Sequence, residues 1–303
     1  MSQAQAQLFD SDDLRPPIKR FHIVDVITTV NGGEDIAYAA ARSGVMVGFA
    51  SANKRPPKDV PVEFVDWPFT EIEGPEDVEA AFRKHLAVVK RERPKYAVAP
   101  DVDENVGFNE AVRYAVQLER YCETVIMVPK SIHPLDVPSR FRVGMPCQER
   151  FGGTPHPWSE YRECREVHVL GGHPTKQLEV EKYYVPVRSI DTAVPISRAR
   201  WGDVWSDRKF IRKREGFYGS VEQSFANIWT EWNGTNICLG RLERTKYTRP
   251  KENDRRYYED PLDIEPWLGE EDDIPFPGRA WCLENNIKDW KERISRRQEL
   301  RNR

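Results

Sequence analysis

Cysteine is scarce in this 303-residue sequence, and no two cysteines stand close enough to begin a metal or redox motif. The five cysteines are Cys122, Cys147, Cys164, Cys238 and Cys282. Neither a CxxC nor a CxC pair is present, so the patterns of a zinc ribbon and of a thioredoxin-type redox site are missing. We therefore expect isolated reduced thiols and no structural metal.

Long apolar runs are missing as well. No run approaches the roughly 18 residues that span a bilayer. The first residues, MSQAQAQLFDSDDLRPP, lack the basic-then-apolar order of a signal peptide. Hydrophobic residues make up 39% of the chain and charged residues 31%, which favours a soluble protein. These features predict a cytoplasmic protein with no membrane partner.

Short β-rich runs recur over the first two thirds of the chain. They are Phe21–Ile27, Val45–Ala50, Val62–Trp67, Tyr96–Asp101, Thr124–Pro129, Phe141–Cys147, Val167–Gly172 and Val187–Thr192. Helical patterns fill three of the segments between them, at Glu34–Arg42, Pro75–Arg93 and Asn105–Tyr121. Eight strands alternating with helices predict a closed (β/α)8 barrel of the TIM type over residues 19–205, an α/β fold.

The two ends of the chain differ from this pattern. Residues 1–18 are polar and stop at Pro16-Pro17, so we expect a disordered segment. Residues 206–303 begin with aromatic and basic side chains and end in a charged helix expected from Leu283 to about Leu300. This C-terminal extension either caps the barrel or forms a small appended domain, and the sequence leaves both alternatives open.

Three of the β-rich runs end in an aspartate. Asp66 ends the third run, Asp101 the fourth and Asp191 the eighth. In an α/β barrel the carboxyl ends of all strands open into one mouth, so these acids are expected to converge although they lie far apart in the chain.

The segment from Val167 to Trp205 contains an ordered pair of motifs. The first is Leu170-Gly171-Gly172-His173-Pro174, and the second runs from Ile190-Asp191 through Pro195 to Ala199-Arg200 and Gly202. The pair resembles the tRNA-guanine transglycosylase superfamily, which includes the DNA-acting 7-deazaguanine transglycosylases of phages and bacteria. The resemblance implies exchange of guanine in a nucleic acid for a free 7-deazaguanine base such as preQ0, with neither a metal nor a redox cofactor.

The same resemblance implies roles for the acids. Asp191 would attack C1′ of the target nucleotide as a nucleophile, and Asp66 would transfer protons to and from the bases. Asp101 would accept hydrogen bonds from the Watson–Crick edge of the base. The other residues expected to contact the base are Lys130, Gly144, Gly171, Gly172 and His173. The glycines qualify because they let the backbone approach a flat ring closely.

Basic residues after the eighth run are candidates for contacts with phosphates. They are Arg198 and Arg200, followed by the cluster Arg208, Lys209, Arg212, Lys213 and Arg214. A solvated surface accounts for such a cluster equally well. The expected partners are therefore a nucleic acid and a free base, and a homodimer is compatible with the sequence.

The chain also departs from the superfamily pattern. Pro129-Lys130-Ser131 stands where family members commonly carry a glutamine, and Trp67-Pro68-Phe69 follows Asp66 in place of Ser-Gly-Gly. No histidine follows His173, so the zinc subdomain of the tRNA enzymes cannot be built, which favours DNA over tRNA as the substrate. The alternatives are a tRNA-guanine transglycosylase, a barrel hydrolase or lyase acting on nucleosides or sugars, and a catalytically inactive nucleic-acid-binding protein.

Overall fold

A computed structural model describes residues 23–31, 33–147, 153–213 and 216–234. Several sequence predictions lie outside these ranges. They concern the N-terminal segment 1–18, Arg214, Cys238, Cys282 and the helix expected after Leu283.

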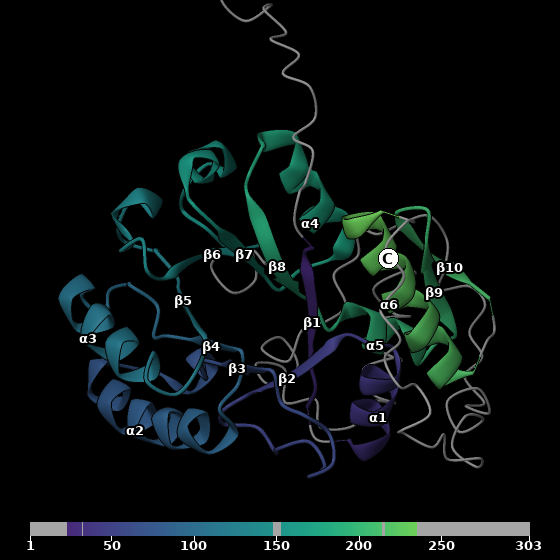
Figure 1. The fold of residues 1–303 in the computed structure, drawn as a ribbon, viewed down its shortest axis with the longest axis horizontal. Coiled ribbons are helices and arrows are strands. Elements are labelled where there is room, and N and C mark those ends of the chain that lie inside the picture. The colour runs from purple at the N-terminus through teal and green to yellow at the C-terminus, as the bar shows by residue number, and fades with distance from the viewer. Residues whose placement is uncertain (1–22, 32, 148–152, 214–215, 235–303) are drawn as a thin grey trace, which may run out of the picture. The chain divides into compact units, whose positions relative to one another are not determined.

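Eight parallel strands close into a barrel (Figure 1). They are β1 (Asp25–Thr29), β2 (Met46–Ala50), β3 (Phe64–Asp66), β4 (Tyr96–Val98), β5 (Thr124–Met127), β6 (Arg142–Pro146), β7 (Val167–Leu170) and β8 (Val187–Asp191). Each strand pairs with the next in parallel, and β1 pairs with β8, with Val26 opposite Ile190. The closed (β/α)8 barrel predicted from the sequence is confirmed.

The three predicted helices form between these strands, as α1 (Glu34–Arg42), α2 (Pro75–Glu92) and α3 (Phe108–Leu118). Two shorter helices, α4 (Pro174–Glu179) and α5 (Val194–Ala199), follow β7 and β8. Local chemistry explains their ends: α1 has two acids in its first turn and Arg42 in its last, and α2 has Pro75 in its first turn. Short 3-10 turns occupy other connectors, namely η3 (Phe69–Glu71), η4 (Pro134–Asp136), η6 (Trp158–Glu163) and η7 (Val180–Tyr183).

After α5 the chain forms a hairpin and one more long helix. The hairpin pairs β9 (Asp203–Ser206) with β10 (Lys209–Arg212), and α6 (Phe217–Asn233) follows. α6 packs against α1, α5 and β1, so it completes the helical layer around the barrel. Its buried face carries the aromatic residues noted in the sequence, among them Phe217, Phe225 and Trp232. The boundary expected at residue 205 falls inside β9.

The last turn of α6 is tied to the chain just before β1. The side chain of Asn233 accepts a hydrogen bond from the backbone nitrogen of Val24 at 2.6 Å and donates one to its backbone oxygen at 3.0 Å. These bonds join residues 209 positions apart, at the seam where β1 meets β8.

None of the helices in the described ranges combines the length and apolar composition that a membrane crossing requires.

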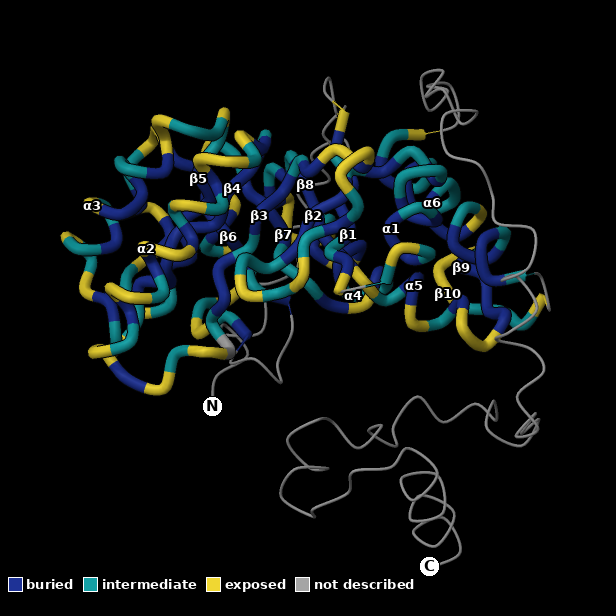
Figure 2. Tube along the Cα trace, turned by 90° about the horizontal axis from the view of Figure 1, so that it is seen from below, coloured by how far each residue is buried: buried dark blue, intermediate teal, exposed yellow. Residues whose placement is uncertain are grey.

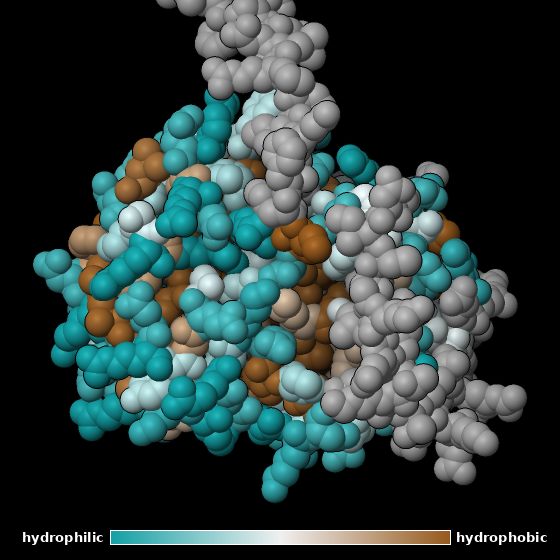
Figure 3. Space-filling model, in the orientation of Figure 1, coloured by the Kyte–Doolittle hydropathy of each residue, from teal (hydrophilic) through white to brown (hydrophobic). Residues whose placement is uncertain are grey.

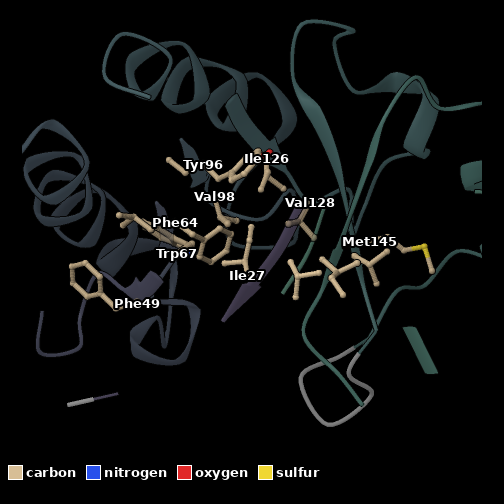
Figure 4. Packing of buried hydrophobic residues seen from close by; sticks show 14 of the residues in the cluster. Ile27, Phe49, Phe64, Trp67, Tyr96, Val98, Ile126, Val128 and Met145 are labelled. Carbon is tan, nitrogen blue, oxygen red and sulfur yellow. The ribbon is translucent and has the colours of Figure 1, made fainter. Parts of the chain in front are cut away.

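Side chains from non-adjacent strands meet inside the barrel. Figure 4 shows residues of several strands in this region, including Ile27, Phe64, Tyr96 and Ile126. Figure 2 shows the strands buried and the outer sides of the helices exposed. The ring of Phe64 fits inside because its neighbour on β2 is Gly48, which has no side chain. A Cβ atom at Gly48 would lie 2.5 Å from the backbone oxygen of Phe64.

We predict that Gly48→Ala destabilises the protein by about 1 to 3 kcal/mol, because the added methyl group meets a backbone atom that cannot move without disturbing the barrel. Gly107→Ala is the matched control: it lies at the start of α3, and a Cβ atom there has no atom within 4 Å. The control is expected to cost less than about 1 kcal/mol. Denaturant unfolding of both variants measures the difference, and equal losses would contradict the prediction.

Candidate active site

A pocket of about 450 Å³ opens at the carboxyl ends of the barrel strands. Its polar lining comprises Thr29, Asn31, Asn53, Asp66, Asp101, Lys130, Asp191 and Ser197. Its apolar lining includes Trp67, Pro68, Phe69, Val98, Val128, Pro146 and Leu170. Figure 3 shows apolar side chains in the middle of one face of the molecule with hydrophilic ones around them. Asp66, Asp101 and Asp191, the three aspartates that the sequence placed at strand ends, all line this one pocket.

Asp191 is held in place through its side chain and its backbone. Its carboxylate oxygen Oδ1 accepts hydrogen bonds from the backbone nitrogen of Gly171 at 2.9 Å and from Nε2 of His168 at 3.1 Å. The buried amide of Gln177 donates to the backbone oxygens of both Gly171 and Asp191, each at 2.7 Å. These bonds fix the ends of β7 and β8 relative to each other.

The glycines after β7 are required by the backbone. Gly171 has φ 60° and Gly172 has φ 90°, conformations that residues with a side chain rarely adopt. The turn points the nitrogen of Gly171 at the carboxylate of Asp191. Both glycines line the pocket.

Asp66 lies two residues after Phe64 on β3, so both side chains point to the same face of the strand. Burial raises the pKa of Asp66 well above its ordinary value of 3.8, and the nearby charges of Asp191 and Asp101 raise it further. A hydrogen bond from the backbone of Trp67 opposes this increase. Asp66 is therefore the carboxyl group of the site that is suited to hold and donate a proton.

Asp101 and Lys130 form an ion pair in the pocket, with Nζ 2.7 Å from Oδ2. Backbone bonds beyond the ends of β4 and β5 align the two residues, because the nitrogen of Lys130 donates to the oxygen of Val102 at 3.0 Å. Burial raises the pKa of Asp101, and Lys130 opposes this rise. The ammonium group also lies 6.0 Å from the centre of the Phe69 ring. Lys130 thus places a cation beside Asp101 in the pocket.

A buried polar chain runs behind Asp191, away from the pocket. Nδ1 of His168 lies 2.7 Å from Oγ of Ser189, which accepts a hydrogen bond from Arg142 at 3.0 Å. Arg142 also donates to Glu166 at 2.8 Å. Sequence reasoning missed these residues. A signal was present, because His168 and Ser189 each stand two residues before an inward-facing position at a strand end, and alternate residues of a strand share a face.

Two residues predicted to contact the base do not line the pocket. Gly144 faces the side chains of Leu170, Val128 and Ile126, so its missing side chain makes room for packing inside the barrel. His173 accepts a hydrogen bond from the backbone nitrogen of Thr175 and caps α4. In the structure Gly144 therefore serves packing and His173 serves helix capping.

The basic residues after β8 fall into two groups. Arg198 and Arg212 pair with the buried carboxylate of Asp203, at 3.2 and 2.8 Å, and so stabilise the hairpin. The second group is exposed and consists of Arg200, Arg208, Lys209 and Lys213. The backbone oxygen of Arg208, in the hairpin turn, accepts a hydrogen bond from Thr175 in the first turn of α4. α4 begins two residues after the pocket-lining Gly172. The exposed basic residues of this turn therefore lie close to the rim of the pocket.

A comparison with protein families matched residues 40–233 to a family of unknown function (DUF6610). The chain belongs to this family. The matched segment runs from α1 to α6 and contains all three pocket aspartates. A comparison with curated proteins found no match.

Two solved structures are similar to the DUF6610 chain. One is phosphoribosyl anthranilate isomerase from Thermus thermophilus, with 14% identity, a TM-score of 0.38, and coverage of 69% of this chain and 100% of that one. The other is a candidate fructose-1,6-biphosphate aldolase from Coccidioides immitis, with 10% identity, a TM-score of 0.40, and coverage of 73% and 92%. At these TM-scores neither likeness bears on function.

The described part of the DUF6610 chain contains no group of three histidine, cysteine, aspartate or glutamate side chains arranged to hold a metal ion. Its three cysteines, Cys122, Cys147 and Cys164, are free thiols. Burial is the main cause that raises their pKa values, to about 12 for Cys122 and Cys147 and about 11 for Cys164. They are therefore poor nucleophiles at neutral pH.

We predict that Asp66→Asn stabilises the folded protein at pH 7 to 8. Because the pKa of Asp66 is higher in the folded state, its contribution to stability is complete below about pH 4 and is lost as pH rises toward the folded value. The amide carries no charge at any of these pH values, so it avoids this loss. Each unit of pKa difference corresponds to about 1.4 kcal/mol.

Thermal unfolding of wild type and Asp66→Asn between pH 4 and pH 8 tests this prediction. The gap between the two melting temperatures should be small near pH 4 and widen as pH rises. Asp136→Asn, at an exposed acid of η4 outside the pocket, controls for the loss of one carboxylate. A gap that stays constant across this range would show that Asp66 ionises as readily as it does in the unfolded chain.

Proposed function

We propose that this protein is a nucleic-acid guanine transglycosylase that exchanges guanine in DNA for a free 7-deazaguanine base. The observation that carries the proposal is the arrangement of Asp66, Asp101 and Asp191 around one pocket. Within it, one carboxylate is oriented by hydrogen bonds, one has a raised pKa, and one is paired with a lysine. These environments suit a nucleophile, a proton carrier and a base-binding group.

The first half of the proposed reaction breaks the bond between the base and the sugar. A carboxylate oxygen of Asp191 attacks C1′, the bond from C1′ to N9 of guanine breaks, and its electron pair leaves with the base. Asp66 supplies the proton that neutralises the departing guanine. The products are a glycosyl ester on Asp191, free guanine, and ionised Asp66.

The second half runs in the opposite direction with another base. The nitrogen of the incoming 7-deazaguanine attacks C1′, and the ester bond to Asp191 breaks, which restores its carboxylate. The proton that this nitrogen loses passes to Asp66, so both aspartates return to their starting states. No metal, reductant or oxidant is needed for this balance.

The dimensions and walls of the pocket suit a planar base. A volume of about 450 Å³ lies in the range of small-molecule sites. Trp67 and Phe69 provide apolar surface on one side, and Gly171 and Gly172 leave backbone exposed on another. Asp101 can accept hydrogen bonds from the donors on the Watson–Crick edge of guanine, and Lys130 can donate to an oxygen of the same ring.

The polymer would bind outside the pocket and present one nucleotide to it. A base within a duplex has to leave the stack to reach the strand ends, at a cost of a few kcal/mol, whereas a single strand avoids much of this cost. The exposed Arg208 and Lys209 of the hairpin turn are suited to phosphates near the rim. We propose DNA as the polymer in place of tRNA, since residues 174–303 contain no histidine for a zinc site like that of the tRNA enzymes.

We predict that Asp191→Asn abolishes base exchange while folding and binding to DNA persist, because an amide keeps the shape of the carboxylate but is a far poorer nucleophile. The measurement is incorporation of radiolabelled guanine into single-stranded DNA, together with denaturing gels that detect a covalent adduct between protein and DNA. The wild type should form an adduct with a slowly reacting incoming base, and the variant should form none.

The same assay distinguishes the alternatives. Release of guanine without incorporation identifies a hydrolase, and binding to DNA without either reaction identifies an accessory protein. Labelling of tRNA in place of DNA identifies the tRNA reaction. Exchange by Asp191→Asn at a rate near that of the wild type would eliminate Asp191 as the nucleophile.

We further predict that Asp66→Asn slows both halves of the exchange by about 10²- to 10⁴-fold, the usual contribution of a proton-transfer group. Asp101→Asn should instead weaken binding of the base, because the amide presents donors where the carboxylate only accepts. Single-turnover rates and inhibition by free guanine separate the two effects. If Asp66→Asn changed only the affinity for guanine, Asp66 would be a binding residue and the proton carrier would have to be sought among the other pocket groups.

A further inference from the structure

The polar chain behind Asp191 occupies a place that apolar side chains usually fill in barrels of this type. Arg142 is 8% exposed, and His168 and Ser189 are fully buried. They come from β6, β7 and β8 and form one connected line that ends at the pocket carboxylate. Burying polar groups inside a barrel costs free energy unless each group is hydrogen-bonded. A functional role for this line of residues would explain why it is kept there.

The donors and acceptors of this line can be assigned from the chemistry of the groups. Arginine can only donate, so Oγ of Ser189 accepts the bond from Arg142 at 3.0 Å. An ionised carboxylate can only accept, so Nε2 of His168 carries the ring hydrogen and donates it to Oδ1 of Asp191 at 3.1 Å. In a neutral ring Nδ1 is then unprotonated, and it accepts the hydroxyl hydrogen of Ser189 at 2.7 Å.

We propose that His168 is a positioning residue, a neutral imidazole whose Nε2–H holds Oδ1 of Asp191 so that Oδ2 faces the pocket as the reacting oxygen. Both hydrogen bonds to the Asp191 side chain, from His168 and from the nitrogen of Gly171, fall on Oδ1. The consequence for reactivity rests on the transglycosylase function proposed above. The tautomer of His168 does not depend on that function.

The surroundings of His168 keep the ring neutral. Burial lowers its pKa, and the positive charge of Arg142 lowers it further, whereas Asp191 acts in the opposite direction. Phe64 stacks on the ring at 5.5 Å between centroids, and Tyr96 lies 6.5 Å away. The other charged groups nearby are Asp25, which favours the protonated ring, and Glu166, which pairs with Arg142. A neutral donor leaves the negative charge on Asp191, where a nucleophile needs it.

Ser189, His168 and Asp191 are not arranged as the catalytic triad of a serine hydrolase. In a hydrolytic triad the histidine lies between the acid and a serine that faces the substrate. Here Ser189 is fully buried and does not line the pocket, whereas Asp191 does. The acid is thus the member placed to react, and the serine fixes the histidine.

The tautomer can be measured on the wild-type protein with ¹⁵N-labelled histidine. NMR at pH 7 is expected to show His168 neutral, with a protonated Nε2 and an unprotonated Nδ1. A ring protonated on Nδ1, or on both nitrogens, would overturn the proposal whether or not the protein exchanges bases.

Two substitutions test the effect on Asp191. His168→Phe keeps a flat ring against Phe64 but cannot donate, so adduct formation should slow by about 10- to 100-fold, the usual effect of one hydrogen bond to a charged group. His168→Gln carries an amide nitrogen that can donate to the same oxygen, and it should recover most of the rate. Affinity for DNA should stay within about threefold of the wild type in both variants.

The outcomes separate this proposal from the function on which its kinetic part rests. Equal slowing in the two variants, or a loss confined to affinity, would leave His168 a purely structural residue and overturn the proposal. If the wild type formed no adduct at all, the proposed function would fail, and the NMR result would still decide the tautomer. Should His168→Phe not fold, the comparison of His168→Gln with the wild type and the NMR measurement carry the test.

Discussion

Closure of the barrel between β1 and β8 is the constraint on which the site depends. Asp191 ends β8, and its strand pairs with β1 on one side and β7 on the other. Only a closed ring of strands brings this end within one pocket together with the ends of β3 and β4. The seam is reinforced from outside, because α6 packs on α1, α5 and β1, and Asn233 bonds to both backbone atoms of Val24.

Closure also creates an electrostatic problem, since three carboxylates meet in a small volume. The protein meets this problem differently at each acid. Asp101 has the ammonium group of Lys130 at 2.7 Å, and Asp191 has two hydrogen-bond donors on one oxygen. Among the described residues no cation pairs with Asp66, and its pKa is raised by burial and by the charges of Asp191 and Asp101. Neighbouring like charges make a carboxyl group harder to ionise.

The candidate site was predictable where chemistry follows directly from position along a strand. The three aspartates and the Gly171-Gly172 turn could be placed because strand ends converge in a barrel, and they line the pocket. Gly144 and His173 do not line the pocket, because glycine and histidine near a strand end also serve packing and helix capping. His168 and Ser189 share a strand face with the residues at the ends of β7 and β8, but their partnership could not be predicted because the two residues lie on neighbouring strands.

The sequence by itself determined the number and order of the eight barrel strands, three of the helices, and the acids at three strand ends, because these follow from periodicity and local stop signals. The tertiary structure alone decided what surrounds each acid. The pairing of Asp101 with Lys130, the pKa of Asp66 and the line from Arg142 to Asp191 all depend on distances between residues remote in the chain. Such distances are set by barrel closure and side-chain packing, which no local pattern encodes.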